Sequence, residues 1–269
     1  MSTARVGDHE LFYERGGSGE PLLLIMGMSG THLTWGEPFL EALRRDFETV
    51  IYDHRGIGKS AEAPAGYSIA DLADDAAGLL DVLGWESAHV VGISMGGMVA
   101  QELVLRHPER VRTLTLGCTY AGGEGSSLSA PAVIQGLTAA MTSGDRERAL
   151  RASWEYNVSA RFGADEDQYA EFRRRAIEVP ARLPAIMAQM QAIQPHDTSA
   201  RLGQITAPTL VIHGTEDQML PSANAEAIGR RIPGARVEIL DGIGHLFFWE
   251  EPERSAELVR SHALAGAAR

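Results

Sequence analysis

The chain has 269 residues, of which 44% are hydrophobic, so it can bury a sizeable core as one large domain or as a domain that carries an insertion. A formal net charge of -12 makes nucleic acid and anionic membrane surfaces poor partners, because both would repel the protein, and it favours a small neutral ligand. Cys118 is the only cysteine, which excludes an internal disulfide and disfavours a cysteine-based metal site, so we expect no metal.

Residues 1–20 contain no continuous apolar stretch that could act as a signal sequence. No run elsewhere in the chain is long enough to span a bilayer. We therefore expect a cytoplasmic protein that does not bind membranes.

Short apolar runs rich in β-branched residues recur along the chain, with helical patterns between them. They occupy residues 11–15, 21–26, 48–53, 89–93, 112–118, 208–214 and 236–242. Strands that alternate with helices predict an α/β protein with a mostly parallel central sheet flanked by helices. One of these helices begins at Ser68 and ends at Gly84, and its apolar residues fall on a single face that should pack on the sheet.

The alternation of strands and helices stops after Cys118. A Gly/Ser-rich stretch follows, residues 131–194 have only helical patterns, and strands resume at Pro208. An all-helical insertion between two strands of one sheet should lie on top of that sheet as a cap. The expected boundaries are residues 1–121 and 198–269 for the core and 122–197 for the cap.

The stretch "GISMG" places Ser94 between Gly92 and Gly96, at the end of a predicted strand and the start of a predicted helix. This context fits the G-x-S-x-G nucleophile elbow better than a Gly-rich turn with an incidental serine. A serine on so tight a turn is strained, and larger neighbours would collide with the adjoining strand and helix. The turn should lift the hydroxyl of Ser94 above the sheet edge and aim the N–H of Met95 at the same point.

A nucleophilic serine needs a base and a carboxylate that orients the base. His245 lies in a Gly-flanked loop after the last predicted strand, and Asp217 follows the strand before it. The chain order Ser94, Asp217, His245 is the order expected of α/β-hydrolases. Asp241 is the rival carboxylate, and Glu216 should point to solvent. His213, at a strand end, is interpreted as structural.

A second oxyanion donor is expected in the loop "IMGMSG", after the strand 21–26. A turn at Gly27 would let the N–H of Met28 face the N–H of Met95, and two such donors stabilise a developing oxyanion.

We expect no catalytic role for two stretches that contain basic residues. "DHRGIGKS" ends like a phosphate-binding loop, but Asp53 stands where that motif needs glycine, so no nucleotide is expected and Asp53 and Arg55 should hold the loop by local hydrogen bonds. The run 173–175 is interpreted as a solvated helix face.

Taken in order, "DHRGIGKS", "GISMGG", "HGTEDQMLP" and "GIGH" make the chain resemble the α/β-hydrolase superfamily over nearly all of its length outside the cap. It is most similar to the cofactor-free serine esterases and lactonases that include 3-oxoadipate enol-lactonases and aclacinomycin methylesterase. This resemblance implies cap helices after the sixth strand and no cofactor. The loop departs from the common His-Gly pattern by having Met26 before Gly27, and a serine nucleophile argues against haloalkane dehalogenase or epoxide hydrolase chemistry.

The resulting hypothesis is a serine hydrolase of carboxylic esters that works through an acyl-enzyme intermediate. Ser94 would attack, His245 would transfer the proton and Asp217 would orient His245. An enol-lactonase, a C–C bond hydrolase and a perhydrolase or cofactor-free haloperoxidase would use the same triad, and a ligand receptor built on a hydrolase fold is the alternative outside enzymes. The sequence leaves the choice between a monomer and a homo-oligomer open.

The expected substrate is neutral, apolar and medium-sized, because flexible apolar side chains gather in the cap and in the loops facing it. The residues predicted to bind it are Gly27, Trp35, Met141, Trp154, Met187, Met190 and Met219.

Overall fold

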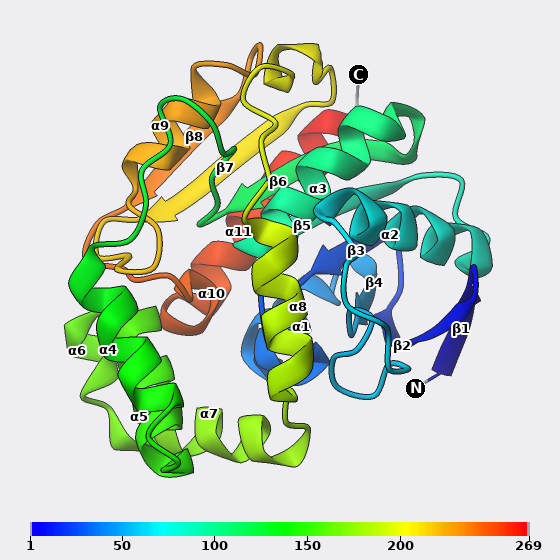
Figure 1. Cartoon of the computed structure of the whole chain (residues 1–269). Coiled ribbons are helices and arrows are strands. Elements are labelled where there is room, and N and C mark those ends of the chain that lie inside the picture. Colours follow the sequence, from blue (N-terminus) through cyan, green and yellow to red (C-terminus); the bar gives the residue numbers. More distant parts are fainter. Residues whose placement is uncertain (1, 268–269) are drawn as a thin grey trace.

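The computed structural model describes residues 2–267, which form an eight-stranded sheet with helices on both faces (Figure 1). The strand order is β1-β2-β4-β3-β5-β6-β7-β8. The pairs β1·β2 and β2·β4 are antiparallel, and the other neighbouring strands pair in parallel. The strands are β1 (Ser2–Val6), β2 (His9–Gly17), β3 (Glu20–Ile25), β4 (Phe47–Tyr52), β5 (Ala88–Ile93), β6 (Val111–Gly117), β7 (Thr209–Gly214) and β8 (Arg236–Leu240).

Two hydrophobic clusters cover the two faces of the sheet. One contains buried residues of α2, α3 and α9, and the other contains buried residues of α1, α10 and α11. The helices of the core are α1 (Glu37–Leu43), α2 (Ile69–Leu83), α3 (Met95–Arg106), α9 (Ala223–Gly229), α10 (Phe247–Glu250) and α11 (Pro252–Ala267), with short 3-10 turns η1 (His32–Trp35), η2 (Pro108–Arg110) and η3 (Leu202–Gln204). This confirms the α/β class and the flanking helices that the sequence predicted. No helix within residues 2–267 is both long enough and apolar enough to cross a membrane.

The helix α2 shows how local sequence sets these elements. The hydroxyl of Ser68 accepts a hydrogen bond from the N–H of Asp71, and Gly84 ends the helix in a left-handed conformation with φ 70°. A serine cap satisfies an N–H that the first helical turn leaves free, and glycine adopts positive φ without strain. Both ends therefore lie where the sequence places them.

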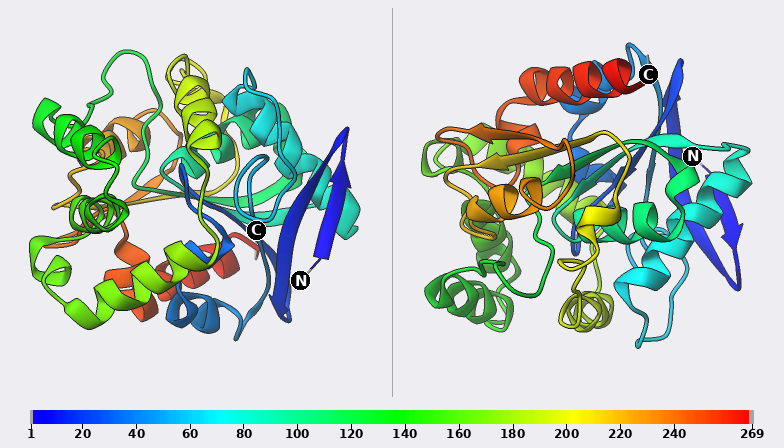
Figure 2. Two further views of the ribbon diagram at one scale, coloured as in Figure 1. Left: turned by 60° about the horizontal axis from the view of Figure 1, so that its bottom comes forward. Right: turned by 90° about the horizontal axis from the view of Figure 1, so that it is seen from above.

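The strand β1 was not predicted. It forms a hairpin with β2 at one edge of the sheet, far from the cap, as Figure 2 shows. Only Ala4 and Val6 of this strand are buried, because it lies at the edge and one face is exposed to solvent. Two small apolar residues in alternation give too weak a pattern to identify a strand. With β1 counted, the helical insertion follows the sixth strand.

Five helices connect β6 to β7: α4 (Pro131–Met141), α5 (Arg146–Asn157), α6 (Ala160–Gly163), α7 (Glu166–Glu178) and α8 (Leu183–Ile193). We call them the cap. The cap attaches to the core in two places, since Trp154, Val158 and Tyr169 join the hydrophobic cluster of α1, α10 and α11, whereas Ala188 and Ala192 join the cluster of α2, α3 and α9. In Figures 1 and 2, α8 lies apart from α4, α5 and α6.

The parallel strands end at one edge of the sheet, beneath the cap. Gly27, Ser94 and Cys118 follow the carboxyl ends of β3, β5 and β6, and Asp217 and His245 lie in the loops after β7 and β8. Ligands of α/β sheets bind at this edge because the loops after neighbouring strands converge there. The fold thus gathers residues that are up to 218 positions apart, from Gly27 to His245.

The loop after β4 is held from within by Asp53. Its carboxylate accepts hydrogen bonds from the N–H of His32 at 2.6 Å and the N–H of Lys59 at 2.8 Å. Arg55 pairs with Asp75 on α2 at 2.6 Å. Asp53 therefore holds its loop by local hydrogen bonds, as predicted, whereas Arg55 ties the loop to a helix.

Candidate active site

Ser94 lies on a strained turn between β5 and α3. Its φ of 56° and ψ of -121° are unusual for a residue with a side chain, and such a conformation costs about 1–3 kcal/mol. Four hydrogen bonds hold the turn. The N–H of Ser94 donates to the carbonyl of Gly117 at 2.8 Å. The Ser94 carbonyl accepts from the N–H groups of Gly97 and Met98 at 2.9 and 3.2 Å and from the hydroxyl of Thr119 at 2.7 Å. The backbone of Ser94 is therefore held in place.

The two glycines beside Ser94 are required by close approaches of the backbone. A Cβ on Gly92 would lie 2.3 Å from the carbonyl oxygen of Gly96, and a Cβ on Gly96 would lie 2.0 Å from the carbonyl oxygen of Ile25. Both distances are far below van der Waals contact. This crowding is the physical reason for the G-x-S-x-G pattern in this chain.

The loop after β3 passes directly over Ser94. A Cβ on Gly27 would lie 3.0 Å from the Cβ of Ser94 and 3.6 Å from its Oγ. Met28, the next residue, is half-buried and lines the same cavity as Ser94, while Met95 begins α3 and is buried. The peptides that contain the N–H groups of Met28 and Met95 therefore adjoin Ser94 from two sides.

Asp217 is buried and its two carboxylate oxygens are fully engaged. Oδ1 accepts from the N–H groups of Met219 and Leu220 at 2.8 and 2.9 Å. Oδ2 lies 2.7 Å from Nδ1 of His245 and 2.9 Å from Nε2 of His213. Burial disfavours the charged carboxylate, but His245 and His213 outweigh that effect and hold the pKa of Asp217 well below its usual range.

His213 is the residue of this group that the sequence interpretation left out of the site. Its Nε2 lies 2.8 Å from the carbonyl of Leu220 as well as 2.9 Å from the carboxylate of Asp217. The spacing of four residues between His213 and Asp217 across a strand end is the only signal in the sequence for this contact. His213, which was interpreted as structural, therefore contacts the buried carboxylate of Asp217 and helps to hold it in place.

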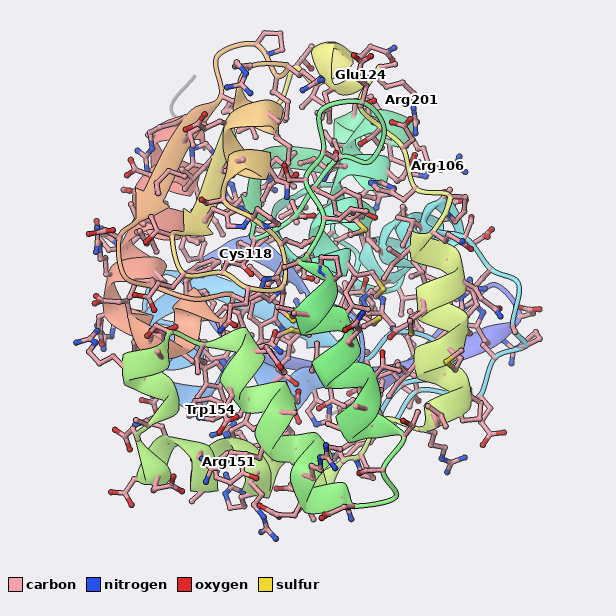
Figure 3. The ribbon with its side chains drawn as sticks, turned by 60° about the vertical axis from the view of Figure 1, so that its left-hand side comes forward. Arg106, Cys118, Glu124, Arg151, Trp154 and Arg201 are labelled. Atoms are coloured by element: carbon pink, nitrogen blue, oxygen red, sulfur yellow. The ribbon has the colours of Figure 1, made fainter. Side chains whose placement is uncertain are left out.

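Cys118 also approaches the Asp217–His245 pair, near the middle of the molecule in Figure 3. Potential ligand atoms of these three residues lie within 4.8 Å of one another, and no other such group of three occurs within residues 2–267. Burial and the nearby carboxylate of Asp217 raise the pKa of the Cys118 thiol well above its usual range, so the thiol is neutral. Because His245 Nδ1 is bonded to Asp217, the carboxylate can orient the imidazole ring for proton transfer.

The other two acids considered from the sequence, Asp241 and Glu216, do not contact the Asp217–His245 pair. Asp241 is exposed and accepts a hydrogen bond from the hydroxyl of Thr215 at 3.2 Å. Glu216 is exposed, as expected, and accepts from the N–H of Ala160 at 3.3 Å. Within residues 2–267, neither carboxylate forms a hydrogen bond with His245.

Glu250 supports the loop of His245, and no pattern in the sequence pointed to this residue. Its carboxylate accepts hydrogen bonds from the N–H groups of Gly244 and Ser159, both at 2.8 Å. A Cβ on Gly244 would lie 2.5 Å from the carbonyl carbon of Val158. The loop of His245 is therefore packed against the cap between α5 and α6.

A cavity of about 370 Å³ lies between the core and the cap and contains both Ser94 and His245 in its wall. Of the residues predicted to bind substrate, Gly27, Met141 and Met219 line it, together with Met28. Further apolar side chains come from the cap: Leu137, Leu150, Phe172, Val179 and Ile186. The cavity thus has Ser94 and His245 on the core side and a mainly apolar wall on the cap side.

Trp35 and Trp154 do not line this cavity, which corrects the prediction for both. Trp35 is fully buried and packs on Phe39 and Phe248 in the core. Trp154 is fully buried within the cap, where it lies 5.9 Å from Trp249 between ring centroids and donates to the carbonyl of Gly163 (Figure 3). Both large rings serve packing, the usual role of a buried tryptophan.

Met187 and Met190 also lie outside the cavity, contrary to the prediction. Their side chains are 47% and 48% exposed, while Ile186 on the same helix lines the cavity. Neighbouring positions on a helix point in different directions, so the methionine content of α8 alone could not show which side faces the cavity.

Arg175 departs from the expected solvated face, although its neighbours Arg173 and Arg174 are exposed. Its side chain is only 13% exposed, pairs with Glu171 at 2.6 Å, and donates to the carbonyl of Leu33 at 3.4 Å. It lines the cavity, as does Arg146 at the start of α5. Arg146 forms no salt bridge with any residue of the described chain.

Comparison with known proteins agrees with the fold. The model of the alpha/beta hydrolase fold family matches residues 20–252. The protein RutD of Azorhizobium caulinodans, whose name describes a carbamate hydrolase, is 32% identical over 96% of this chain and 97% of its own. The rhodomycin D methylesterase DnrP of Streptomyces peucetius is 30% identical over 98% of this chain and 99% of its own. The solved structure of the enol-lactonase from Burkholderia xenovorans is 27% identical and superposes with a TM-score of 0.85 over 98% of this chain and 100% of its own.

Proposed function

Because the chain belongs to the α/β-hydrolase family, we propose that it hydrolyses carboxylic esters through an acyl-enzyme formed on Ser94. One observation carries the proposal: a serine on a strained turn shares a cavity with His245, which is bonded at 2.7 Å to a buried, ionised carboxylate. A nucleophile, a base and an orienting acid in this order are the parts that acyl transfer needs.

The reaction begins when the hydroxyl oxygen of Ser94 attacks the ester carbonyl while His245 takes the hydroxyl proton. Asp217 stabilises the imidazolium that forms, and the N–H groups of Met28 and Met95 stabilise the oxyanion. The C–O bond of the ester then breaks, and the alcohol leaves with the proton from His245. Water, deprotonated by His245, attacks the acyl group, and the acid departs as the proton returns to Ser94.

The cavity supports a neutral, medium-sized apolar substrate. Its cap wall is formed mainly by apolar side chains, among them Met141, Phe172 and Ile186. The charge of Arg175 is balanced by Glu171 at 2.6 Å. Flexible methionines adapt to ligands of different shape, so we expect several esters to be accepted rather than one rigid polar substrate.

A lactonase is the second candidate, and Arg146 is the observation in its favour. This arginine lines the cavity without a carboxylate partner among the described residues, so it is free to pair with an acidic group on a substrate. The likeness to an enol-lactonase structure supports the same candidate. In this case the acyl-enzyme would form by opening the lactone ring, with the alcohol remaining on the acyl group.

The deciding experiment measures kcat/KM of the purified protein for neutral p-nitrophenyl esters of graded acyl length and for 3-oxoadipate enol-lactone, with Ser94→Ala as the blank. A higher kcat/KM for a medium-chain ester supports the esterase, and Arg146→Gln should then change that value by less than about twofold, as for an exposed charge away from the reacting atoms. A clear preference for the charged lactone that is lost in Arg146→Gln would establish the second candidate. If neither substrate class is turned over, the protein is not an esterase or lactonase of these substrates.

A further inference from the structure

The cap helix α8 is attached to the core by small residues and one polar contact. Ala188 and Ala192 are buried against the core, whereas Leu183, Met187 and Met190 are more than one-third exposed. Between them lies Gln189, which is fully buried. A buried glutamine is uncommon, because an amide without hydrogen bonds is unfavourable away from water.

The amide oxygen of Gln189 binds the loop that covers Ser94. The N–H of Ser29 donates to Oε1 of Gln189 at 2.8 Å. Within residues 2–267 this is the only side-chain hydrogen bond formed by residues of α8. The contact spans 160 positions in the sequence and joins α8 to the residue directly after Met28.

Ser29 is held in a conformation that needs such support. Its φ is 61°, in the left-handed region that residues other than glycine seldom adopt. The turn also contains a weak hydrogen bond from the N–H of Gly30 to the carbonyl of Gly27 at 3.3 Å. Because Met28 and Ser29 are adjacent, the direction of the Ser29 N–H helps to fix the orientation of the peptide that carries the N–H of Met28.

Packing alone does not explain why a glutamine occupies position 189, as the nitrogen of its amide indicates. Its Nε2 is buried and has no hydrogen-bond partner. An apolar side chain of the same length would fill the space without an unsatisfied donor. The amide oxygen is therefore the group that the position uses.

We infer that Gln189 is a positioning residue for the oxyanion hole, through which the placement of α8 sets the orientation of the Met28 N–H. The inference rests on the proposed function, since it assigns Gln189 a part in ester hydrolysis at Ser94. It makes α8 more than a wall of the cavity: a displacement of this helix would change the rate of the chemical step as well as substrate binding. A misplacement of about 1 Å at a reacting group can lower a rate on the order of 100-fold.

The test compares two variants. Gln189→Met keeps the length of the side chain but removes the oxygen that accepts from Ser29, whereas Gln189→Glu keeps an oxygen acceptor. The control is Gln191→Met, the same substitution at an exposed position of the same helix. Each variant is assayed for kcat and KM with p-nitrophenyl acetate and for thermal unfolding. Amide hydrogen exchange of residues 27–31 gives a readout that does not depend on turnover.

We expect Gln189→Met to lower kcat at least about tenfold with less than about a threefold change in KM, and to accelerate exchange of the Ser29 amide. Gln189→Glu should stay within about threefold of the wild-type kcat, and Gln191→Met should match the wild type. If Gln189→Met lowers only the melting temperature, or if the folded variant keeps the wild-type kcat and exchange, the inference is wrong. If the wild type hydrolyses no ester but the exchange of Ser29 still depends on Gln189, the proposed function fails while the contact with the loop stands.

Discussion

The core and the cap contribute to one cavity in different ways. The core contributes groups fixed by many bonds: the backbone of Ser94 makes four hydrogen bonds, and the carboxylate of Asp217 has four polar partners. The cap contributes mainly apolar side chains, such as Leu137, Met141 and Ile186. Directional bonds fix positions and apolar contacts fix only shape, so we expect the core to determine the chemistry and the cap to determine the choice of substrate.

The largest effect should come from the core, in Ser94→Ala. Loss of the nucleophile is expected to lower kcat by about five to six orders of magnitude on every substrate, because the remaining groups cannot form an acyl-enzyme. Turnover of the purified variant and its circular dichroism spectrum measure activity and fold together. A folded variant with turnover near that of the wild type would refute the assignment of Ser94.

Within the core, the buried acid and the exposed acid should behave differently. Asp217→Asn is expected to lower kcat by about 10⁴-fold, since an amide at this position favours the wrong tautomer of His245. Asp241→Asn is the matched control and should change kcat by less than about threefold, because the Asp241 carboxylate is exposed and bonded to Thr215. Steady-state kinetics of both variants decide the matter, and the opposite ranking would move the orienting role to Asp241.

We expect a mutation in the packed part of the cap to lower the stability of the protein more than the rate of the chemical step. Trp154→Ala removes a fully buried ring that contacts Trp249 and Phe172, so it should destabilise the protein by about 3–5 kcal/mol. Urea unfolding measures the change. Trp35→Ala removes an equally buried ring from the core and gives a comparison. If the cap unfolds independently of the core, Trp154→Ala will produce a separate early transition and Trp35→Ala will not.

The difference between core and cap also explains what the sequence could and could not predict. The strands, the helix from Ser68 and the turn at Ser94 follow from local rules: apolar runs, capping residues and glycines at close approaches. Each of these rules acts over a few residues. Asp217 and His245 were found from their places directly after predicted strands, and the family resemblance agreed with that choice.

The cap residues could not be assigned by such rules, because their roles depend on which face of each helix meets the core. Trp154 lies on the highly charged helix α5 and is fully buried, whereas Met141 ends the apolar helix α4, is partly exposed and lines the cavity. Gln189 and Arg175 were missed for the same reason, since a glutamine and an arginine on a helix normally face solvent. The edge strand β1 was missed because its exposed face weakens the apolar pattern.

The smallest effect, and the sharpest test of the comparison, is expected at Met141. This residue and Met187 are similar side chains of the cap, 44% and 47% exposed, but only Met141 lines the cavity. Met141→Ala removes apolar contact with the part of a substrate that reaches the cap, so kcat/KM should fall by about three- to tenfold for a long acyl chain and by less than about twofold for an acetyl ester. Met187→Ala should leave both values unchanged. Equal losses for both acyl lengths in Met141→Ala would mean that the cap acts on the chemical step and not on the choice of substrate, and the division of roles between core and cap would then be wrong.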